Sequence, residues 1–166
     1  VPVIICYPLA KRVFPIPQLV LSIAWGFGVL ISWTAVTGNL ETATWLLWGA
    51  TIFWTLGFDT VYAMSDKPDD LKVGINSSAI FFGKYAAEAV GIFFALTAGL
   101  IAYLGLEMNL QPIFWLGWII TVVGWIWQYL RLRQTDLPRP VYGEIFSQNV
   151  WLGFILLVGM ILGCLV

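Results

Sequence analysis

Long apolar segments separated by short polar connections run through the whole chain. Five of these segments have the roughly 20 residues that an α-helix needs to cross a bilayer, and they lie at about 18–36, 43–62, 85–104, 113–130 and 145–166. The first nine residues are also apolar, and we expect them to be the end of another span. The pattern therefore predicts an all-α fold, a polytopic transmembrane helical bundle with five complete spans plus the end of a sixth.

The composition agrees with a membrane protein and removes several kinds of chemistry. Of the 166 residues, 60% are hydrophobic and 10% are charged, whereas about 25% of the residues of a soluble domain are charged. The chain has no histidine, which excludes His-based zinc sites and a Ser-His-Asp triad. Cys6 and Cys164 lie in apolar segments and are expected to be small buried hydrophobes. The metal chemistry that remains uses oxygen ligands, which favours Mg²⁺ or Mn²⁺.

The charged residues are distributed unevenly across the predicted membrane. If the chain crosses five times, all eight basic residues lie on one side, and the opposite loops carry only Glu41 and Glu107. The basic residues are Lys11, Arg12, Lys67, Lys72, Lys84, Arg131, Arg133 and Arg139. Because cytoplasmic loops are enriched in Lys and Arg, the basic side is predicted to be cytoplasmic. A net charge of −1 argues against a nucleic-acid partner.

One polar stretch, DTVYAMSDKPDDLK at residues 59–72, begins inside the second predicted span and holds four of the nine acidic residues. Part of it follows a spacing of three, four and four residues, which on a continuous helix gives one shared face. The positions on that face are Asp59, Tyr62, Asp66 and Asp70.

Pro68 interrupts this stretch. Proline suits the first turn of a helix but not its interior. We therefore expect one helix to finish at Met64 and another to start at Pro68. Asp66 would then precede the second helix, with Asp69 and Asp70 in its first turn.

The four carboxylates invite two interpretations. Crowded carboxylates repel one another unless a cation intervenes, and Mg²⁺ typically binds one or two carboxylates together with substrate phosphates. We interpret the stretch as a site for a divalent metal and, through it, a diphosphate that Lys67 and Lys72 can also contact. The alternative is that Asp66, Asp69 and Asp70 are only caps and dipole partners at a solvated turn.

The stretch also resembles a known family. The segment at residues 59–72, with its continuation KVGINSSAIFFG at 72–83, is similar to the second aspartate-rich motif of the UbiA family of intramembrane prenyltransferases. The segment YPLAKR at residues 7–12, followed by Pro17 and Gln18, matches another family segment at the right distance upstream. Within the family, the sequence is most similar to the 4-hydroxybenzoate polyprenyltransferases.

This resemblance implies a bundle of nine spans around a cavity, with two aspartate-rich loops facing each other at its cytoplasmic end. It also implies Mg²⁺-assisted transfer of a polyprenyl group from its diphosphate to the ring of 4-hydroxybenzoate, in ubiquinone or plastoquinone biosynthesis. The protein would be integral to the bacterial inner membrane, with its active site on the cytoplasmic side. Its partners would be the two substrates and membrane lipid, with no nucleic acid and no protein partner.

The resemblance also assigns roles to individual residues. The implied catalytic residues are Asp59, Tyr62, Asp66 and Asp70. The implied metal ligands are Asp59, Asp66, Asp69 and Asp70. The implied substrate-binding residues are Lys11, Arg12, Lys67 and Lys72, with Arg12 preferred over Lys11. Asn149, near the start of the last span, either faces the cavity and binds substrate or forms a hydrogen bond to a neighbouring helix.

One departure from the family is that its first aspartate-rich motif does not occur in the sequence. We therefore expect residues 1–166 to be the C-terminal part of a single prenyltransferase domain, inactive alone. An enzyme with another aromatic acceptor, a membrane transporter and a structural subunit remain as alternatives. Two local predictions complete the picture: Gly159-x-x-x-Gly163 is a helix-packing motif, and Glu88 pairs with Lys84 at helical spacing.

Overall fold

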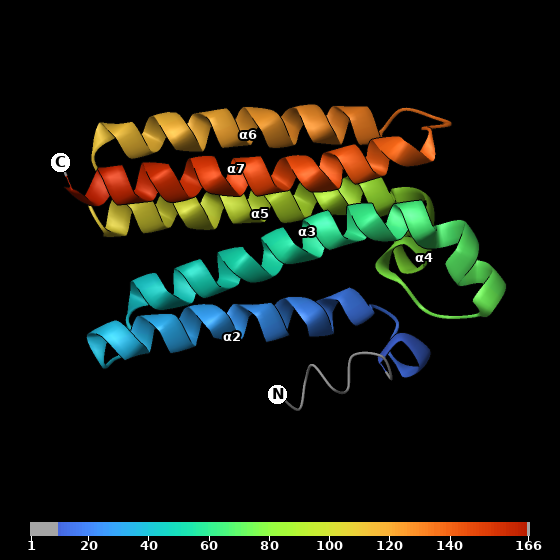
Figure 1. Ribbon diagram of the computed structural model, residues 1–166, viewed down its shortest axis with the longest axis horizontal. Helices are drawn as coiled ribbons and strands as arrows, with labels where there is room; N and C mark the ends of the chain where they lie inside the picture. The colour runs from blue at the N-terminus through green and yellow to red at the C-terminus, as the bar shows by residue number, and fades with distance from the viewer. Residues whose placement is uncertain (1–9, 166) are drawn as a thin grey trace.

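The protein is a bundle of long helices that lie side by side (Figure 1). The computed structural model describes residues 10–165. The long helices are α2 (Pro17–Thr37), α3 (Thr42–Val73), α5 (Ala86–Glu107), α6 (Pro112–Leu132) and α7 (Arg139–Leu165). A short helix, α4 (Ser78–Phe82), and a 3-10 turn, η1 (Gly83–Tyr85), join α3 to α5. No strand occurs in this part of the chain, so the predicted all-α fold is confirmed.

Four stretches are long and apolar enough to cross a membrane. They are Pro17–Thr37, Ser78–Glu107, Pro112–Leu132 and Arg139–Leu165. The second predicted span, now α3, runs alongside them (Figure 1), but it is more polar because Trp and Thr are frequent in its first half and charged residues in its second. The membrane character of the protein is therefore confirmed, whereas a crossing by α3 stays a prediction. The predicted end of a sixth span, residues 1–9, lies outside the described residues.

The predicted break at Pro68 is wrong, because α3 continues through this residue to Val73. Proline removes one backbone donor and leaves the carbonyl four residues earlier, that of Met64, without its helical partner. Pro68 is exposed, so water can satisfy that carbonyl. Figure 1 shows that the last turns of α3 bend away from the first part of the helix, as expected for a proline kink. The helix ends only where Gly74 adopts a φ of 74° and its N–H binds the Asp70 carbonyl.

The start of α7 also differs from the prediction. We expected a polar loop over residues 131–143, but the helix begins at Arg139. Pro140 falls in its first turn, where proline is well tolerated because the missing N–H would be unpaired in any case. The connection between α6 and α7 is therefore short, and Arg139 lies in the first turn of α7.

α3 is at the centre of the packing, because it contacts α2, α4, α5 and α7, while α6 packs on α5 and α7. The core includes Val61, Val90, Phe94, Phe114, Trp125 and Ile145. The end of α3, α4 and the α6–α7 loop gather at one end of the bundle (Figure 1). Cys164 is exposed near the other end, so its predicted burial is wrong, and Cys6 lies outside the described residues.

Glycines let α6 and α7 approach closely. A Cβ atom added to Gly163 would lie 2.9 Å from Cβ of Phe114 on α6, whereas one added to Gly159 would meet its nearest neighbours at 3.6 Å. The carbonyl of Gly163 also accepts a hydrogen bond of 3.1 Å from the backbone N–H of Gln111. The predicted packing role of this Gly-x-x-x-Gly motif is confirmed, and Gly163 is its tighter member.

The two motif glycines should therefore respond differently to alanine. We expect Gly163→Ala to lower the free energy of unfolding by about 1–3 kcal/mol, because Phe114 must move. Gly159→Ala should stay within about 0.5 kcal/mol of the parent, since its added methyl fits. Thermal unfolding in detergent measures both. Equal losses from the two variants would contradict this account.

Candidate functional site

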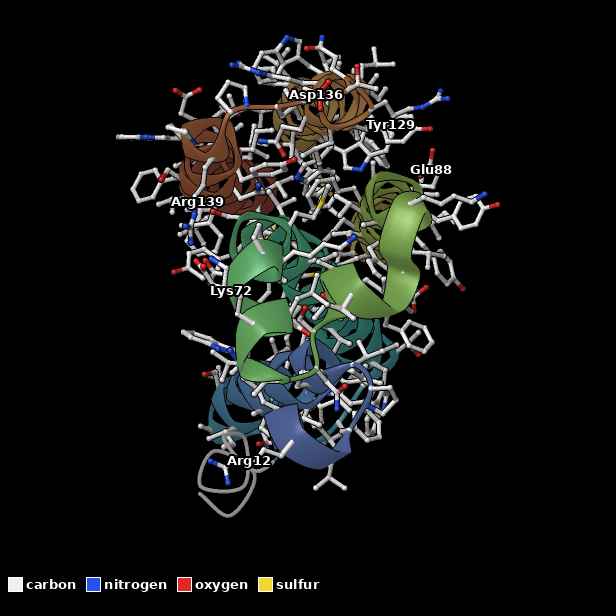
Figure 2. The ribbon with its side chains drawn as sticks, turned by 90° about the vertical axis from the view of Figure 1, so that its right-hand side faces the viewer. Arg12, Lys72, Glu88, Tyr129, Asp136 and Arg139 are labelled. Carbon is white, nitrogen blue, oxygen red and sulfur yellow. The ribbon has the colours of Figure 1, made fainter. Side chains whose placement is uncertain are left out.

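The acidic stretch lies on the second half of α3, at the end of the bundle that faces the viewer in Figure 2. On a continuous helix with a rise of 1.5 Å per residue, Asp59 and Asp70 are roughly 16 Å apart along the axis, while Asp66 and Asp70 are about one turn apart. The described residues contain no group of three or more His, Cys, Asp or Glu side chains that could hold a metal. The four predicted ligands therefore do not form one compact cluster within this part of the chain.

Arg139, from the start of α7, joins two of the predicted ligands. Its Nη2 lies 3.1 Å from Oδ1 of Asp66 and 2.9 Å from Oδ2 of Asp69. Its Nε donates a hydrogen bond of 3.4 Å to the hydroxyl oxygen of Ser65. Figure 2 shows Arg139 and Lys72 on the same flank of this end. The guanidinium thus bridges neighbouring turns of α3 from across 73 residues of sequence.

Asp69 has a second cationic neighbour. The Lys72 ammonium lies 3.2 Å from its Oδ1. The hydrogen bond from Lys72, followed by that from Arg139, lowers the pKa of the Asp69 carboxyl below its ordinary value. The hydrogen bond to Asp66, followed by that to Asp69, raises the pKa of the Arg139 guanidinium. The Asp69 carboxylate and the Arg139 guanidinium therefore stay charged at neutral pH.

The other two predicted ligands have different surroundings. Asp70 is buried, and its backbone carbonyl accepts hydrogen bonds from the N–H groups of Gly74 and Ile75 at the end of α3. Asp59 has a buried Oδ2 atom that finds no hydrogen-bond partner among the described residues. The positive charge of Lys11 acts on this carboxyl group, so the structure brings together two predicted site residues from distant segments.

The remaining predicted basic residues are distributed around this end. Lys67 donates a hydrogen bond of 3.4 Å to the Gly83 carbonyl, which ties α3 to the connection before α5. Arg12 is exposed and lies on the far side of the bundle from Arg139 (Figure 2). Lys11 is the member of this pair whose charge acts on Asp59, and the preference for Arg12 as a substrate-binding residue stays a prediction.

Aromatic side chains precede the carboxylates along α3. Trp54, Phe58 and Tyr62 recur every fourth residue, and Asp66 and Asp70 continue the same row, which gives one ridge along the helix. The Phe58 and Tyr62 rings lie 5.6 Å and 5.4 Å from the ring of Phe146 on α7. We call Trp54, Phe58, Tyr62, Asp66 and Asp70 the α3 ridge. It leads from an aromatic interior to a charged end.

Asn149 lies beside this ridge and has no free hydrogen-bonding capacity. Its Oδ1 accepts from the indole N–H groups of Trp54, at 3.0 Å, and Trp125, at 3.1 Å. Its Nδ2 donates to Oε1 of Gln128, at 3.1 Å, and to the Ile145 carbonyl, at 2.9 Å. An amide side chain makes about four hydrogen bonds, so this geometry fits the interhelical alternative rather than substrate binding.

Two interactions could not be found by reading the sequence locally. Arg139 has no spacing signal, because its partners lie 73 and 74 residues away, and only the shared side of the predicted topology connects them. Glu88 pairs with Arg133, at 3.7 Å, so the predicted pair with Lys84 is wrong. The 3-10 turn at Gly83–Tyr85 interrupts the α-helical spacing on which that prediction depended.

Comparison with known proteins agrees with this architecture. The sequence profile of the UbiA prenyltransferase family matches residues 1–150. The chain belongs to the UbiA family. Its fold superposes on that of a UbiA homologue from Aeropyrum pernix K1, solved in its apo form, with a TM-score of 0.79 and 25% identity over 96% of this chain and 59% of that one.

Two sequence relatives are named for a specific transfer. A 4-hydroxybenzoate solanesyltransferase of Synechocystis sp. is 64% identical over 99% of this chain and 56% of its own length. A 4-hydroxybenzoate octaprenyltransferase of Aromatoleum aromaticum is 41% identical over 94% of this chain and 52% of its own length. The chain thus spans about half the length of the curated relatives it matches.

The buried hydrogen bonds of Asn149 yield a stability prediction. Asn149→Ala should lower the free energy of unfolding by about 1–3 kcal/mol, because it leaves the two indole N–H groups and Oε1 of Gln128 without a partner. Thermal unfolding in detergent measures the change. The control is Gln148→Ala, which removes a single contact of 3.2 Å with Gln128 and should cost less. A larger loss for Gln148→Ala would contradict this network.

The ion pairs of Asp69 yield a pH prediction. Because its pKa is depressed, the stabilisation is fully present above the ordinary aspartate value of about 3.9 and is lost as the pH falls through the lower folded value. We expect the Asp69 carboxyl carbon, followed by ¹³C NMR, to titrate below about 3.9, and Lys72→Gln to raise its midpoint. A midpoint in the parent protein at or above the ordinary value would be the contrary result.

Proposed function

We propose that the full-length protein transfers a polyprenyl group from polyprenyl diphosphate to the ring of 4-hydroxybenzoate, as a step in ubiquinone or plastoquinone biosynthesis. Family membership supports a prenyltransferase, and the names of the relatives from Synechocystis sp. and Aromatoleum aromaticum support this donor and acceptor. The residues described above form one part of the site, together with the first aspartate-rich motif of the family.

The α3 ridge is the observation that carries the proposal. A polyprenyl diphosphate has a long apolar chain and a strongly anionic head, and the ridge presents the two matching environments in that order along one helix. The apolar chain would lie along Trp54, Phe58 and Tyr62. The diphosphate would lie at the charged end, near Asp66 and Asp70. A substrate dissolved in lipid would meet this surface without leaving the membrane.

The residues fit a divalent cation in the way that Mg²⁺ is usually held. Asp66 and Asp70 are one helical turn apart, and Mg²⁺ commonly takes only one or two carboxylates and completes its octahedron with phosphate oxygens and water. The buried Oδ2 of Asp59 finds no hydrogen-bond partner among the described residues, but it lies about three turns from Asp70, too far along the helix to bind the same ion. When bound, Mg²⁺ would offset the negative charge that develops on the departing diphosphate.

In the proposed reaction, the C–O bond of the donor breaks before the new C–C bond forms. The allylic C–O bond breaks and its electron pair leaves with the diphosphate. A ring carbon next to the hydroxyl of 4-hydroxybenzoate supplies the electron pair for the new C–C bond and then loses its proton. The faces of Phe58 and Tyr62 would stabilise positive charge on the allylic carbon. Lys72 and Lys11 would attract the diphosphate or the benzoate carboxylate.

The remaining parts of the proposal concern place and partners. The basic residues gather at the end of the bundle that carries α4, so the positive-inside rule supports a cytoplasmic site. The protein would reside in a bacterial inner membrane, with membrane lipid around it. Its partners would be the two substrates, without nucleic acid and without a second protein.

An activity assay tests the proposal. Membranes containing the full-length protein would receive Mg²⁺, labelled 4-hydroxybenzoate and a polyprenyl diphosphate, and lipid-soluble product would be measured. We expect Asp66→Asn to reduce kcat/KM by about 100-fold or more, the scale of losing one preorganised contact to developing charge. Asp136→Asn is the matched control, because Asp136 is exposed at the same end and its φ of 58° is one that asparagine tolerates.

The outcomes separate the alternatives. Product from the parent and from Asp136→Asn but not from Asp66→Asn supports the proposal. Product only with a different aromatic acceptor would keep the prenyltransferase and replace the acceptor. Unchanged turnover in Asp66→Asn would mean that the acidic stretch is a set of helix caps, and it would overturn the proposed mechanism.

A further inference from the structure

Arg139 occupies an unusual electrostatic position. It is the first residue of α7, and the N-terminus of a helix carries a partial positive charge that disfavours a cation. Two carboxylates on α3 compensate for this, at 3.1 Å for Asp66 and 2.9 Å for Asp69. The contact with α3, rather than the local helix, is therefore what holds the guanidinium where it is.

The backbone around Arg139 is constrained, while its side chain is free to move. Pro138 and Pro140 flank the residue, and each ring fixes its own φ and restricts the residue before it. The side chain of Arg139 remains 60% exposed, and those of its partners are 33% and 50% exposed. Exposed ion pairs are weak and exchange readily. A competing cation can therefore displace the guanidinium without moving α7.

A metal at the acidic stretch would create that competition. The two partners of Arg139, Asp66 and Asp69, lie one turn apart on α3, and both are among the metal ligands that the family resemblance implies. Once a divalent cation neutralises these carboxylates, the guanidinium loses its partners beside the place where the diphosphate is bound. Its planar fork suits two phosphate oxygens at once.

We propose that Arg139 is a diphosphate-binding residue whose guanidinium stays paired with Asp66 and Asp69 until a divalent metal displaces it from these carboxylates. This inference rests on the proposed function and adds to it a residue and an order of events. The guanidinium would leave Asp66 and Asp69 when a divalent cation binds there, and it would then hold the diphosphate. In the absence of metal, the same arginine stays paired with Asp66 and Asp69.

A matched comparison comes from the end of α6, at the other side of the short connection to α7. Arg133 also pairs with a carboxylate across helices, at 3.7 Å from Glu88, but on α5 and away from the acidic stretch. Arg133→Gln removes a similar charge and a similar exposed ion pair. Any effect specific to Arg139 must therefore come from its contact with Asp66 and Asp69.

Two measurements on the full-length protein in lipid nanodiscs test the proposal. Mn²⁺ binding without substrate, followed by electron paramagnetic resonance, should tighten about three- to tenfold in Arg139→Gln, because a competing cation is gone. The KM for polyprenyl diphosphate should rise about tenfold or more, because a charge-assisted contact is lost. Arg139→Lys should keep the parent's Mn²⁺ affinity and still raise KM, since it keeps the charge but not the fork.

A merely structural role predicts another pattern. If Arg139 only ties α7 to α3, Arg139→Gln should leave Mn²⁺ affinity unchanged or weaken it, and its KM should match that of Arg133→Gln; either result overturns the inference. Thermal unfolding confirms that each variant is folded, and Arg139→Lys carries the KM test if Arg139→Gln is not.

Failure of this inference can be told from failure of the proposed function. An active parent with an inactive Asp66→Asn and an unaffected Arg139→Gln rejects only the role of Arg139. A parent that gives no product from any acceptor rejects the function, and the Mn²⁺ measurement then still reports whether Arg139 competes with metal.

Discussion

The continuity of α3 is the constraint on which the rest of the structure depends. Its 32 residues give a helix roughly 48 Å long, whereas the hydrocarbon core of a bilayer is about 30 Å thick. A helix of this length that crosses the membrane, as the sequence predicts for α3, extends beyond the lipid at one end, and the acidic stretch lies in its second half. Since Pro68 bends the helix without ending it, the aromatic and acidic residues stay in register on one ridge.

Two kinds of polar contact hold this helix, and they differ in strength for a physical reason. Asn149 is buried, and all its hydrogen bonds are made within the bundle, so breaking one leaves an unsatisfied group away from water. The ion pairs of Arg139 are exposed to solvent and cost little to exchange. The bundle is therefore rigid beside the aromatic part of the ridge and adjustable at its charged end, which suits the diphosphate site that we propose there.

The helices could be predicted from the sequence better than their boundaries and the contacts between them. The apolar segments, the basic end and the acidic face could be predicted, because burial in lipid requires long apolar segments and one face of a helix has a regular residue spacing. The predicted break at Pro68 was wrong, because water can pair with the Met64 carbonyl that proline leaves without its helical partner. A rule based on the residue type alone does not include this effect of solvent exposure. The partner of Glu88 was wrong because the 3-10 turn at Gly83–Tyr85 changes the spacing. The ion pairs of Arg139 could not be predicted, because they depend on how α7 packs against α3. For Asn149, the sequence left substrate binding and an interhelical hydrogen bond as alternatives, because its contacts with Trp54 and Trp125 depend on the packing of the helices.

The most direct measurement is a cryo-electron microscopy structure of the full-length protein with Mg²⁺ and an unreactive thio analogue of a polyprenyl diphosphate. Our account predicts metal density beside Asp66 and Asp70, the prenyl chain along Phe58 and Tyr62, and the Arg139 guanidinium on the diphosphate. Diphosphate density elsewhere, with Arg139 still bound to Asp66 and Asp69 and no metal on the ridge, would contradict it.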